Sequence, residues 1–222
     1  GGVVGVSTLY HLTKKGWTDV VLLERTELTA GSTWHAAGLL PLFNMSYTVG
    51  QLHKYSVDLY KRLPAETGQE VGFHVTGNLR LATCRDRMDE YKKYCGTANT
   101  IGVPFQLISP AEVKQLWPLV NLGGDADTPA VIGALYHPDD GHIAPADLTM
   151  ALRKAARSAG AEINEQTEVT GGVQMPGGEW KLTTNKGEIT AEHVVLCTGN
   201  YARQTGRMFG LNMPAIPVEH QY

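Results

Sequence analysis

The spacing of apolar residues over the first part of the chain predicts a helix followed by a buried strand. Apolar side chains recur at helical spacing over residues 3–10, and Gly16 follows a polar run. A glycine at that point is typical of a helix C-terminus. Residues 20–23 are all apolar and lead into Glu24, which indicates a strand buried on both faces. This order of elements is typical of an α/β protein.

The next stretch predicts one long amphipathic helix and two strands. The helix is expected over residues 49–63, and the strands at 71–74 and 79–82. In the second strand leucines alternate with Arg80, so one face is apolar and the other is polar. We expect Arg80 at the surface or in an ion pair, although it could meet a substrate carboxylate. The apolar stripe of the helix comprises Leu52, Tyr55, Leu59 and Leu63.

Further helices are predicted at residues 85–101 and 146–159, with a strand at 131–136 between them. The first of these helices is polar and should face solvent on one side. Ser109 and Glu112 have the spacing of a capping box, which predicts the start of a short helix between them.

The last third of the chain predicts short strands separated by turns. Strands at 162–169 and 180–183 precede a buried strand over 189–197, which runs into Thr198 and Gly199. Ligands bind at the carboxyl ends of strands in α/β sheets, so a nucleotide fits at this end. We find no internal repeat and no low-complexity segment.

A glycine motif precedes the first predicted helix. Residues 1–5 match the last five positions of G-x-G-x-x-G, with Gly2 and Gly5 at its glycine positions, and we expect its first glycine just before residue 1. Such glycines let a pyrophosphate approach the backbone, and the helix N-terminus offers it unpaired N–H groups. Glu24 lies 19 positions after Gly5, close to the spacing of an acid that binds a ribose hydroxyl. The alternative is a glycine-rich helix start in an unrelated α/β protein.

The residues around Glu24 narrow the choice of nucleotide only in part. An acid at this position disfavours a 2′-phosphate, but it does not separate NAD from FAD. Arg25 could pack on an adenine, pair with the pyrophosphate, or lie solvated at the surface.

A loop crowded with small residues follows at residues 28–39, with the sequence LTAGSTWHAAGL. Small residues let the backbone pass close to a flat, bulky ligand. Trp34 and His35 lie in the middle of this loop. We interpret it as running along a flavin, with His35 placed to bond to the cofactor. The alternative is a glycine-rich loop that holds an ordinary buried histidine.

The composition excludes several classes of protein. The chain has 222 residues, a formal charge of -3 and 42% hydrophobic residues, as expected of a globular protein. This charge predicts no nucleic-acid partner, and no apolar run is long enough to span a membrane. The three cysteines lack metal-ligand spacing, which indicates reduced thiols. Residues 137–143 hold two histidines and two acids, but proline, aspartate and glycine there favour a turn over a metal site.

Taken together, these residues resemble the dimethylglycine dehydrogenase and sarcosine dehydrogenase family over essentially the whole chain. The matching pieces are GGVVG, LLERTELTAGSTWHAAGL, ETGQEVGFHVTGNLRLAT, YHPDDGHIAPADLTMAL, VVLCTGNYAR and IPVEHQY. The resemblance implies the D-amino-acid-oxidase type of fold, which is an α/β architecture. A Rossmann-like βαβ domain would bind FAD, with its first strand missing here, and an α+β portion of a substrate domain would be inserted into it.

The resemblance also implies a division of the chain into three segments. Residues 1–69 would form the FAD-binding segment, and residues 70–143 a portion of the substrate domain. Residues 144–222 would return to the FAD-binding domain and begin the next substrate-domain strand. We therefore expect the chain to be an N-terminal fragment of a longer protein.

Site residues follow from the resemblance by position. His35 matches the family's histidine that is covalently linked to FAD, and His220, in EHQY, matches a histidine that acts on the substrate amine. No metal is implied. The residues implied to bind FAD are Gly2, Gly5, Glu24, Arg25, Ser32, Thr33, His35, Gly38, Leu39, Val169, Thr198 and Gly199.

The implied reaction is the oxidative demethylation of a small N-methyl amino acid such as dimethylglycine or sarcosine. Hydride transfer to the flavin would give an iminium, and the one-carbon unit would leave as formaldehyde or pass to tetrahydrofolate. Tetrahydrofolate would bind in a C-terminal domain that lies outside this chain. The electron acceptor is not indicated, and the family implies the bacterial cytoplasm or the mitochondrial matrix.

Three alternatives stay open. The chain could belong to another FAD-dependent amine or amino-acid oxidase, or to a noncatalytic flavin-binding subunit. The presence of both His35 and His220 disfavours a noncatalytic subunit. A NAD-dependent Rossmann dehydrogenase explains neither the second group of strands nor the loop around Trp34.

Overall fold

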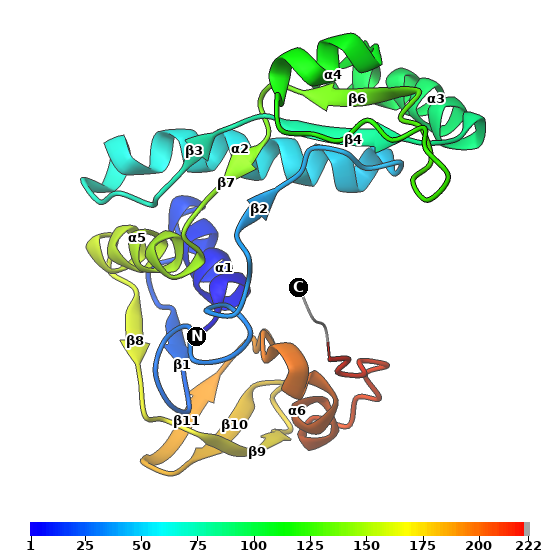
Figure 1. Ribbon diagram of the computed structural model, residues 1–222. Helices are drawn as coiled ribbons and strands as arrows, with labels where there is room; N and C mark the ends of the chain where they lie inside the picture. The colour runs from blue at the N-terminus through cyan, green and yellow to red at the C-terminus, as the bar shows by residue number, and fades with distance from the viewer. Residues whose placement is uncertain (220–222) are drawn as a thin grey trace. The chain divides into compact units, whose positions relative to one another are not determined.

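The computed structural model describes residues 1–219, which group into two compact units. The first unit comprises Gly1–Ala37, Leu63–Val71 and the residues from Ala144 onward. The second unit comprises Gly38–Arg62 and Gly72–Ile143 (Figure 1). Residues 38–62, which we expected in the FAD-binding segment, thus group with the second unit.

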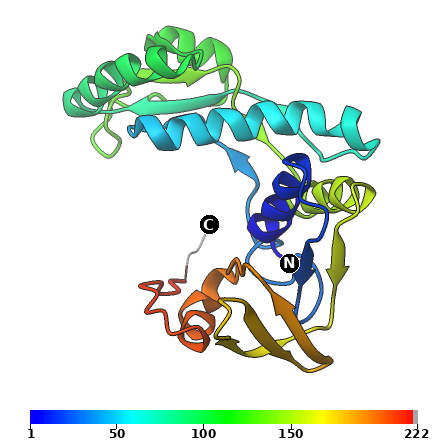
Figure 2. The same ribbon diagram turned by 180° about the vertical axis from the view of Figure 1, so that it is seen from behind.

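The first unit is built on helix α1 (Val3–Lys14), whose side chains at Val6, Leu9 and Tyr10 are buried. Gly16 ends the helical segment with a φ of 89°. Strand β1 (Val21–Leu23) pairs in parallel with β8 (Glu162–Asn164). Helix α5 (Pro145–Ser158) packs against α1, as both views show (Figure 1, Figure 2). The predicted α/β class and the first predicted helix are confirmed.

An antiparallel sheet completes the first unit. Its strands are β9 (Val169–Gln174), β10 (Trp180–Thr184) and β11 (Gly187–Ala191), in the spatial order β11-β10-β9. The 3₁₀ helix η1 (Gly199–Tyr201) and helix α6 (Ala202–Met208) follow them.

The predicted strand over residues 189–197 is wrong beyond Ala191. Residues 193–198 form no ladder with another strand in the described part of the chain. An apolar run becomes a strand only when a neighbouring strand takes its backbone N–H and C=O groups. The segment nevertheless packs on α1, because a Cβ added at Gly5 would lie 3.3 Å from Cys197 Cβ.

The second unit contains two small antiparallel sheets. One consists of β4 (Asn78–Ala82), β6 (Gly133–His137) and β5 (Gln106–Ile108), in the order β4-β6-β5. The other consists of β2 (Leu39–Leu40), β7 (Gly141–His142) and β3 (His74–Val75), in the order β2-β7-β3. The strand expected at 71–74 is therefore only His74–Val75, and it pairs with β7 rather than with β4.

Three helices accompany these sheets. Helix α3 (Arg85–Ile101) has the predicted bounds, and α4 (Pro110–Leu116) begins with the predicted capping box of Ser109 and Glu112. Helix α2 (Tyr47–Thr67) is longer than expected and carries residues of both units. No helix among residues 1–219 is long and apolar enough to cross a bilayer.

The predicted apolar stripe of α2 is only half correct. Leu59 and Leu63 are buried, but the side chains of Leu52 and Tyr55 are 63% and 46% exposed. The first half of α2 instead buries Gly50, where a Cβ would collide with the side chain of Ile101. The packing partner, and not the apolar pattern, therefore decides which face of this helix is covered.

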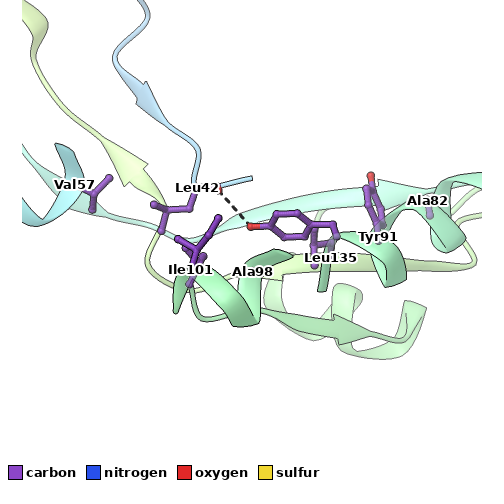
Figure 3. Close-up of a cluster of buried hydrophobic side chains, with 9 residues drawn as sticks. Leu42, Val57, Ala82, Tyr91, Ala98, Ile101 and Leu135 are labelled. Atoms are coloured by element: carbon purple, nitrogen blue, oxygen red, sulfur yellow. Dashed lines mark hydrogen bonds between the residues drawn. The ribbon is translucent and has the colours of Figure 1, made fainter. Parts of the chain in front are cut away.

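The core of the second unit gathers around one face of α3 (Figure 3). Arg80 belongs to this environment, because its guanidinium lies 4.5 Å from the centre of the Phe43 ring. The expectation of a surface or ion-paired Arg80 is therefore corrected to a half-buried residue in a cation–π contact. The core comprises Leu42, Val57, Ala82, Tyr91, Tyr94, Ala98, Ile101, Val103 and Leu135.

Candidate functional site

At the N-terminus of α1, the backbone lies close to the side chain of Thr33 in the loop that carries His35. Gly2 stands at the N-cap, and a Cβ there would lie 2.9 Å from Thr33 Oγ1. That same oxygen accepts a hydrogen bond of 3.0 Å from the backbone N–H of Val3. The first turn of α1 carries no acidic residue, so its N–H groups and helix dipole favour an anion.

Glu24 directly follows β1 and is half-buried. Its Oε2 lies 2.7 Å from the backbone nitrogen of Gly1, and its Oε1 accepts from the backbone N–H of Thr26 at 2.8 Å. Burial acts to raise the pKa of Glu24, and the hydrogen bond from the Thr26 N–H acts to lower it. Glu24 is therefore a hydrogen-bond acceptor beside the glycine motif.

Four hydrogen bonds anchor the loop that carries His35. The Leu28 N–H donates to Glu165 Oε2 at 3.2 Å, and the Thr29 N–H donates to the Gly1 carbonyl at 3.0 Å. Thr33 accepts from the N-terminus of α1, as described above. Ser32 Oγ accepts from Asn200 Nδ2 at 3.1 Å. The loop is thus held against both the glycine motif and the segment after Thr198.

His35 lies exposed on this loop, and its ring stacks on the side chain of Trp34. The two ring centres are 3.7 Å apart, with 33° between the planes. Among residues 1–219, His35 is exposed rather than buried.

The segment after residue 197 supplies polar groups on the other side of the loop. Thr198 Oγ1 is buried and makes no hydrogen bond within the described residues. Gly199 begins η1 with a φ of 52°, a left-handed conformation that favours glycine. Val169 is half-buried at the start of β9.

Two residues of the site were missed from the sequence. Asn200 donates to Ser32, and the Tyr201 ring lies 4.0 Å from the Arg25 guanidinium carbon. Arg25 is thus exposed and stacked on an aromatic ring rather than simply solvated. Both missed residues directly follow Gly199, so the rule that ligands bind at strand ends could have drawn attention to them.

Three sequence-predicted residues fall outside this cluster. Gly38 and Leu39 belong to the second unit, where Gly38 accepts from the Ile143 N–H at 2.9 Å and Leu39 pairs with His142. His220 lies outside the described residues.

The loop at residues 137–143 forms a buried polar network in the second unit. His137 Nε2 lies 3.0 Å from the Tyr94 hydroxyl, and Asp140 Oδ1 accepts from the Leu42 N–H at 2.9 Å. Burial, helped by the nearby Arg80, lowers the pKa of His137 to about 4. Burial also raises the pKa of Asp140 to about 6. Within residues 1–219, no group of three or more His, Cys, Asp or Glu side chains is placed to hold a metal ion.

Comparison with known proteins identifies the family. The family described as FAD dependent oxidoreductase (DAO) matches residues 1–222. Dimethylglycine dehydrogenase from Rattus norvegicus is 45% identical over the whole chain, and the pyruvate dehydrogenase phosphatase regulatory subunit from Mus musculus is 36% identical. The chain spans about a quarter of the length of each of these two relatives (25%).

A solved structure agrees with this match. The L-proline dehydrogenase from P. horikoshii superposes with a TM-score of 0.87 and 31% identity, covering 99% of this chain and 56% of that one. The aligned residues include those of both units. The chain therefore belongs to the FAD dependent oxidoreductase family.

Proposed function

We propose that this chain binds FAD through its first unit and forms part of an enzyme that oxidises an N-methyl group of a small amino acid. Dimethylglycine and sarcosine are the substrates proposed. The observation that carries the proposal is the set of polar and glycine residues gathered at the N-terminus of α1, on a chain 45% identical to a dimethylglycine dehydrogenase. That relative is described as mitochondrial, and we propose the mitochondrial matrix or the bacterial cytoplasm as the location of this protein.

The residues of this site fit a dinucleotide cofactor. The buried hydroxyl of Thr198 has no hydrogen-bond partner in the described residues, as expected of a group that hydrogen-bonds to a bound ligand. Gly2 leaves no room for a side chain between α1 and the loop. We therefore assign the pyrophosphate to Gly2 and Gly5, and a ribose hydroxyl to Glu24.

The remaining assignments follow the course of the anchored loop. We assign His35 as the residue bonded covalently to FAD, which would prevent loss of the cofactor. Arg25 stays a proposed contact of the nucleotide, with its guanidinium already stacked on Tyr201. The other first-unit residues proposed to line the cofactor are Ser32, Thr33, Val169, Thr198 and Gly199.

When bound, FAD supplies the acceptor for the hydride equivalent that leaves the carbon next to the substrate nitrogen. The protein must bind the substrate amine in its neutral form, because the nitrogen lone pair stabilises the developing iminium. We propose His220 for this task, since an imidazole exchanges protons near neutral pH. The one-carbon product would leave as formaldehyde or pass to tetrahydrofolate bound outside this chain.

A second candidate function is that of a flavin-binding regulatory subunit. The 36% identity to the mouse pyruvate dehydrogenase phosphatase regulatory subunit favours it. That relative matches the whole of this chain, as the dimethylglycine dehydrogenase does. The two candidates differ in whether the bound cofactor accepts electrons from an N-methyl amino acid.

Anaerobic titration of the full-length, FAD-loaded protein separates these candidates. We expect dimethylglycine or sarcosine to bleach the visible absorbance of oxidised flavin, and glycine, which lacks the N-methyl group, to leave it unchanged. Bound flavin that stays oxidised with both N-methyl substrates would favour the regulatory subunit. A protein that binds no FAD would contradict both candidates.

A further inference from the structure

Two histidines lie opposite each other on the small β2-β7-β3 sheet of the second unit. His74 of β3 and His142 of β7 are Cα partners in the antiparallel ladder. Directly opposite residues of an antiparallel pair project from the same face of the sheet. The two imidazoles therefore lie side by side, with their ring centres 5.1 Å apart and 46° between the ring planes.

The face of the sheet that carries this pair is open to solvent. Both histidines are exposed, and within residues 1–219 neither imidazole forms a hydrogen bond or an ion pair with a protein group. Leu39 of β2, which pairs with His142 on its other side, is 68% exposed. The ring nitrogens can therefore bind a group that arrives from solvent.

Backbone contacts between β3 and β7 fix the positions of the two histidines. The Asp140 carbonyl accepts from the N–H groups of Thr76 and Gly77 at 3.1 Å and 2.8 Å, just beyond the two strands. Gly141 runs so close to β3 that a Cβ there would collide with the His74 carbonyl oxygen. The backbone thus holds the two side chains on neighbouring strands in one register, and only rotation about their own bonds is needed to aim the ring nitrogens.

The separation of the rings suits one metal ion held between them. In tetrahedral sites Zn²⁺ lies ~2.0–2.1 Å from each imidazole nitrogen, which places two ring centres roughly 5 Å apart. The observed 5.1 Å agrees with this value, although it also fits an ordinary aromatic pair, for which ~4.5–7 Å is typical. Imidazole nitrogens are ligands that suit Zn²⁺ and Cu²⁺, whereas Mg²⁺ and Ca²⁺ take oxygen ligands.

We propose that His74 and His142 form a binding site for a divalent transition-metal ion, of which Zn²⁺ and Cu²⁺ are the best matched. Each neutral imidazole contributes one nitrogen ligand, and water completes the coordination. The site needs only two side chains, fewer than the groups of three or more sought among residues 1–219. The bound ion bridges β3 and β7 and thereby stabilises the second unit. This inference is independent of FAD binding by the first unit.

The test is a calorimetric titration of Zn²⁺ into the full-length protein, prepared without a histidine tag and stripped of metal. We expect saturable binding that His74→Gln and His142→Gln each weaken at least about tenfold, because the second imidazole of a chelating pair binds intramolecularly. Added Zn²⁺ should raise the melting temperature of the wild type, and both variants should lose this rise. Mg²⁺ should show no binding that depends on either histidine.

An exposed histidine of the first unit provides the matched control. The ring of His193 lies edge-on to Trp17, with ring centres 5.8 Å apart. Because its aromatic neighbour is an indole rather than a second imidazole, His193→Gln should leave the Zn²⁺ affinity unchanged. Cu²⁺ added at one equivalent gives a second readout. Its electron paramagnetic resonance spectrum should show two nitrogen ligands in the wild type and one in either variant of the pair.

Each outcome decides whether the two histidines share an ion. Zn²⁺ affinity that neither variant changes, or that only one of them changes, would overturn the shared site. Mg²⁺ binding that both variants weaken equally would also contradict it, because imidazole ligands do not favour that ion. If a variant fails to fold, the Cu²⁺ spectrum of the wild type decides: two nitrogen ligands support the site, and fewer contradict it.

Discussion

The side-chain oxygen of Thr33 accepts a hydrogen bond of 3.0 Å from the backbone N–H of Val3, which lies 30 residues earlier in the chain. This bond joins the loop that carries His35 to the first turn of α1. Gly2 makes the approach feasible, since a Cβ there would press against the same oxygen at 2.9 Å. This hydroxyl group, together with the hydrogen bond from the Thr29 N–H to the Gly1 carbonyl, holds the loop against the glycine motif.

Removing this acceptor should weaken FAD binding. Thr33→Val keeps the shape of the side chain but cannot accept the N–H of Val3. We expect a loss of about 1 kcal/mol, the usual net value of such a bond, which corresponds to about a fivefold rise in the FAD dissociation constant. The measurement is a binding titration in a His35→Ala background, so that only noncovalent binding is followed.

Thr33→Ser is the matched control, because it retains the hydroxyl and loses only a methyl group. It should bind FAD nearly as tightly as the parent. Equal dissociation constants for the Val and Ser variants would show that this hydrogen bond does not organise the site.

His137 and Asp140 should make opposite contributions to the pH dependence of stability. Both side chains are almost fully buried, at 0% and 1% exposure. The pKa of Asp140 is raised to about 6, so Asp140 adds stability at low pH that is lost as pH rises through 6. The pKa of His137 is lowered to about 4, so the neutral histidine adds stability at high pH that is lost as pH falls from about 6.5 toward 4.

We therefore expect the two effects to cancel largely between pH 4 and pH 6 in the wild type, and single variants to reveal them. Relative to wild type, Asp140→Asn should be more stable at pH 7, and this advantage should disappear as pH falls toward 4. His137→Gln should gain relative stability over the same fall in pH. Each change is on the order of 3 kcal/mol, from about 1.4 kcal/mol per pKa unit.

The measurement is the melting temperature of each variant from pH 4 to pH 7.5. His142→Gln is a suitable control, because His142 is exposed on the neighbouring strand β7. Parallel curves for Asp140→Asn, His137→Gln and wild type would contradict the buried titrations.

Elements with local signals were predictable from the sequence. The bounds of α3 and the capping box of α4 depend on residues a few positions apart, and both are confirmed. The strand over 189–197 failed because its pairing depends on distant backbone, and the exposed half of α2 failed because Ile101 covers Gly50 instead. Arg80 was misplaced because its partner, Phe43, lies far away in sequence.

The residues of the candidate site also divide into those that local sequence patterns predict and those that depend on distant contacts. The glycine motif and Glu24 were found from spacing alone, since the geometry of a βα turn fixes where they lie. Asn200 and Tyr201 were missed, because their contacts to Ser32 and Arg25 cross more than half of the chain. Short-range patterns can identify the candidate cofactor-binding turn, but they do not reveal which distant side chains hold the neighbouring loop in place.

The most direct test of the account is made on the full-length protein as it is purified. It is precipitated in acid, washed and digested, and the peptides are searched by mass for bound flavin. We predict that flavin remains on the peptide that contains His35 and is absent from the His35→Ala protein. Flavin that washes away completely, or that is found on a different peptide, would contradict the role assigned to His35.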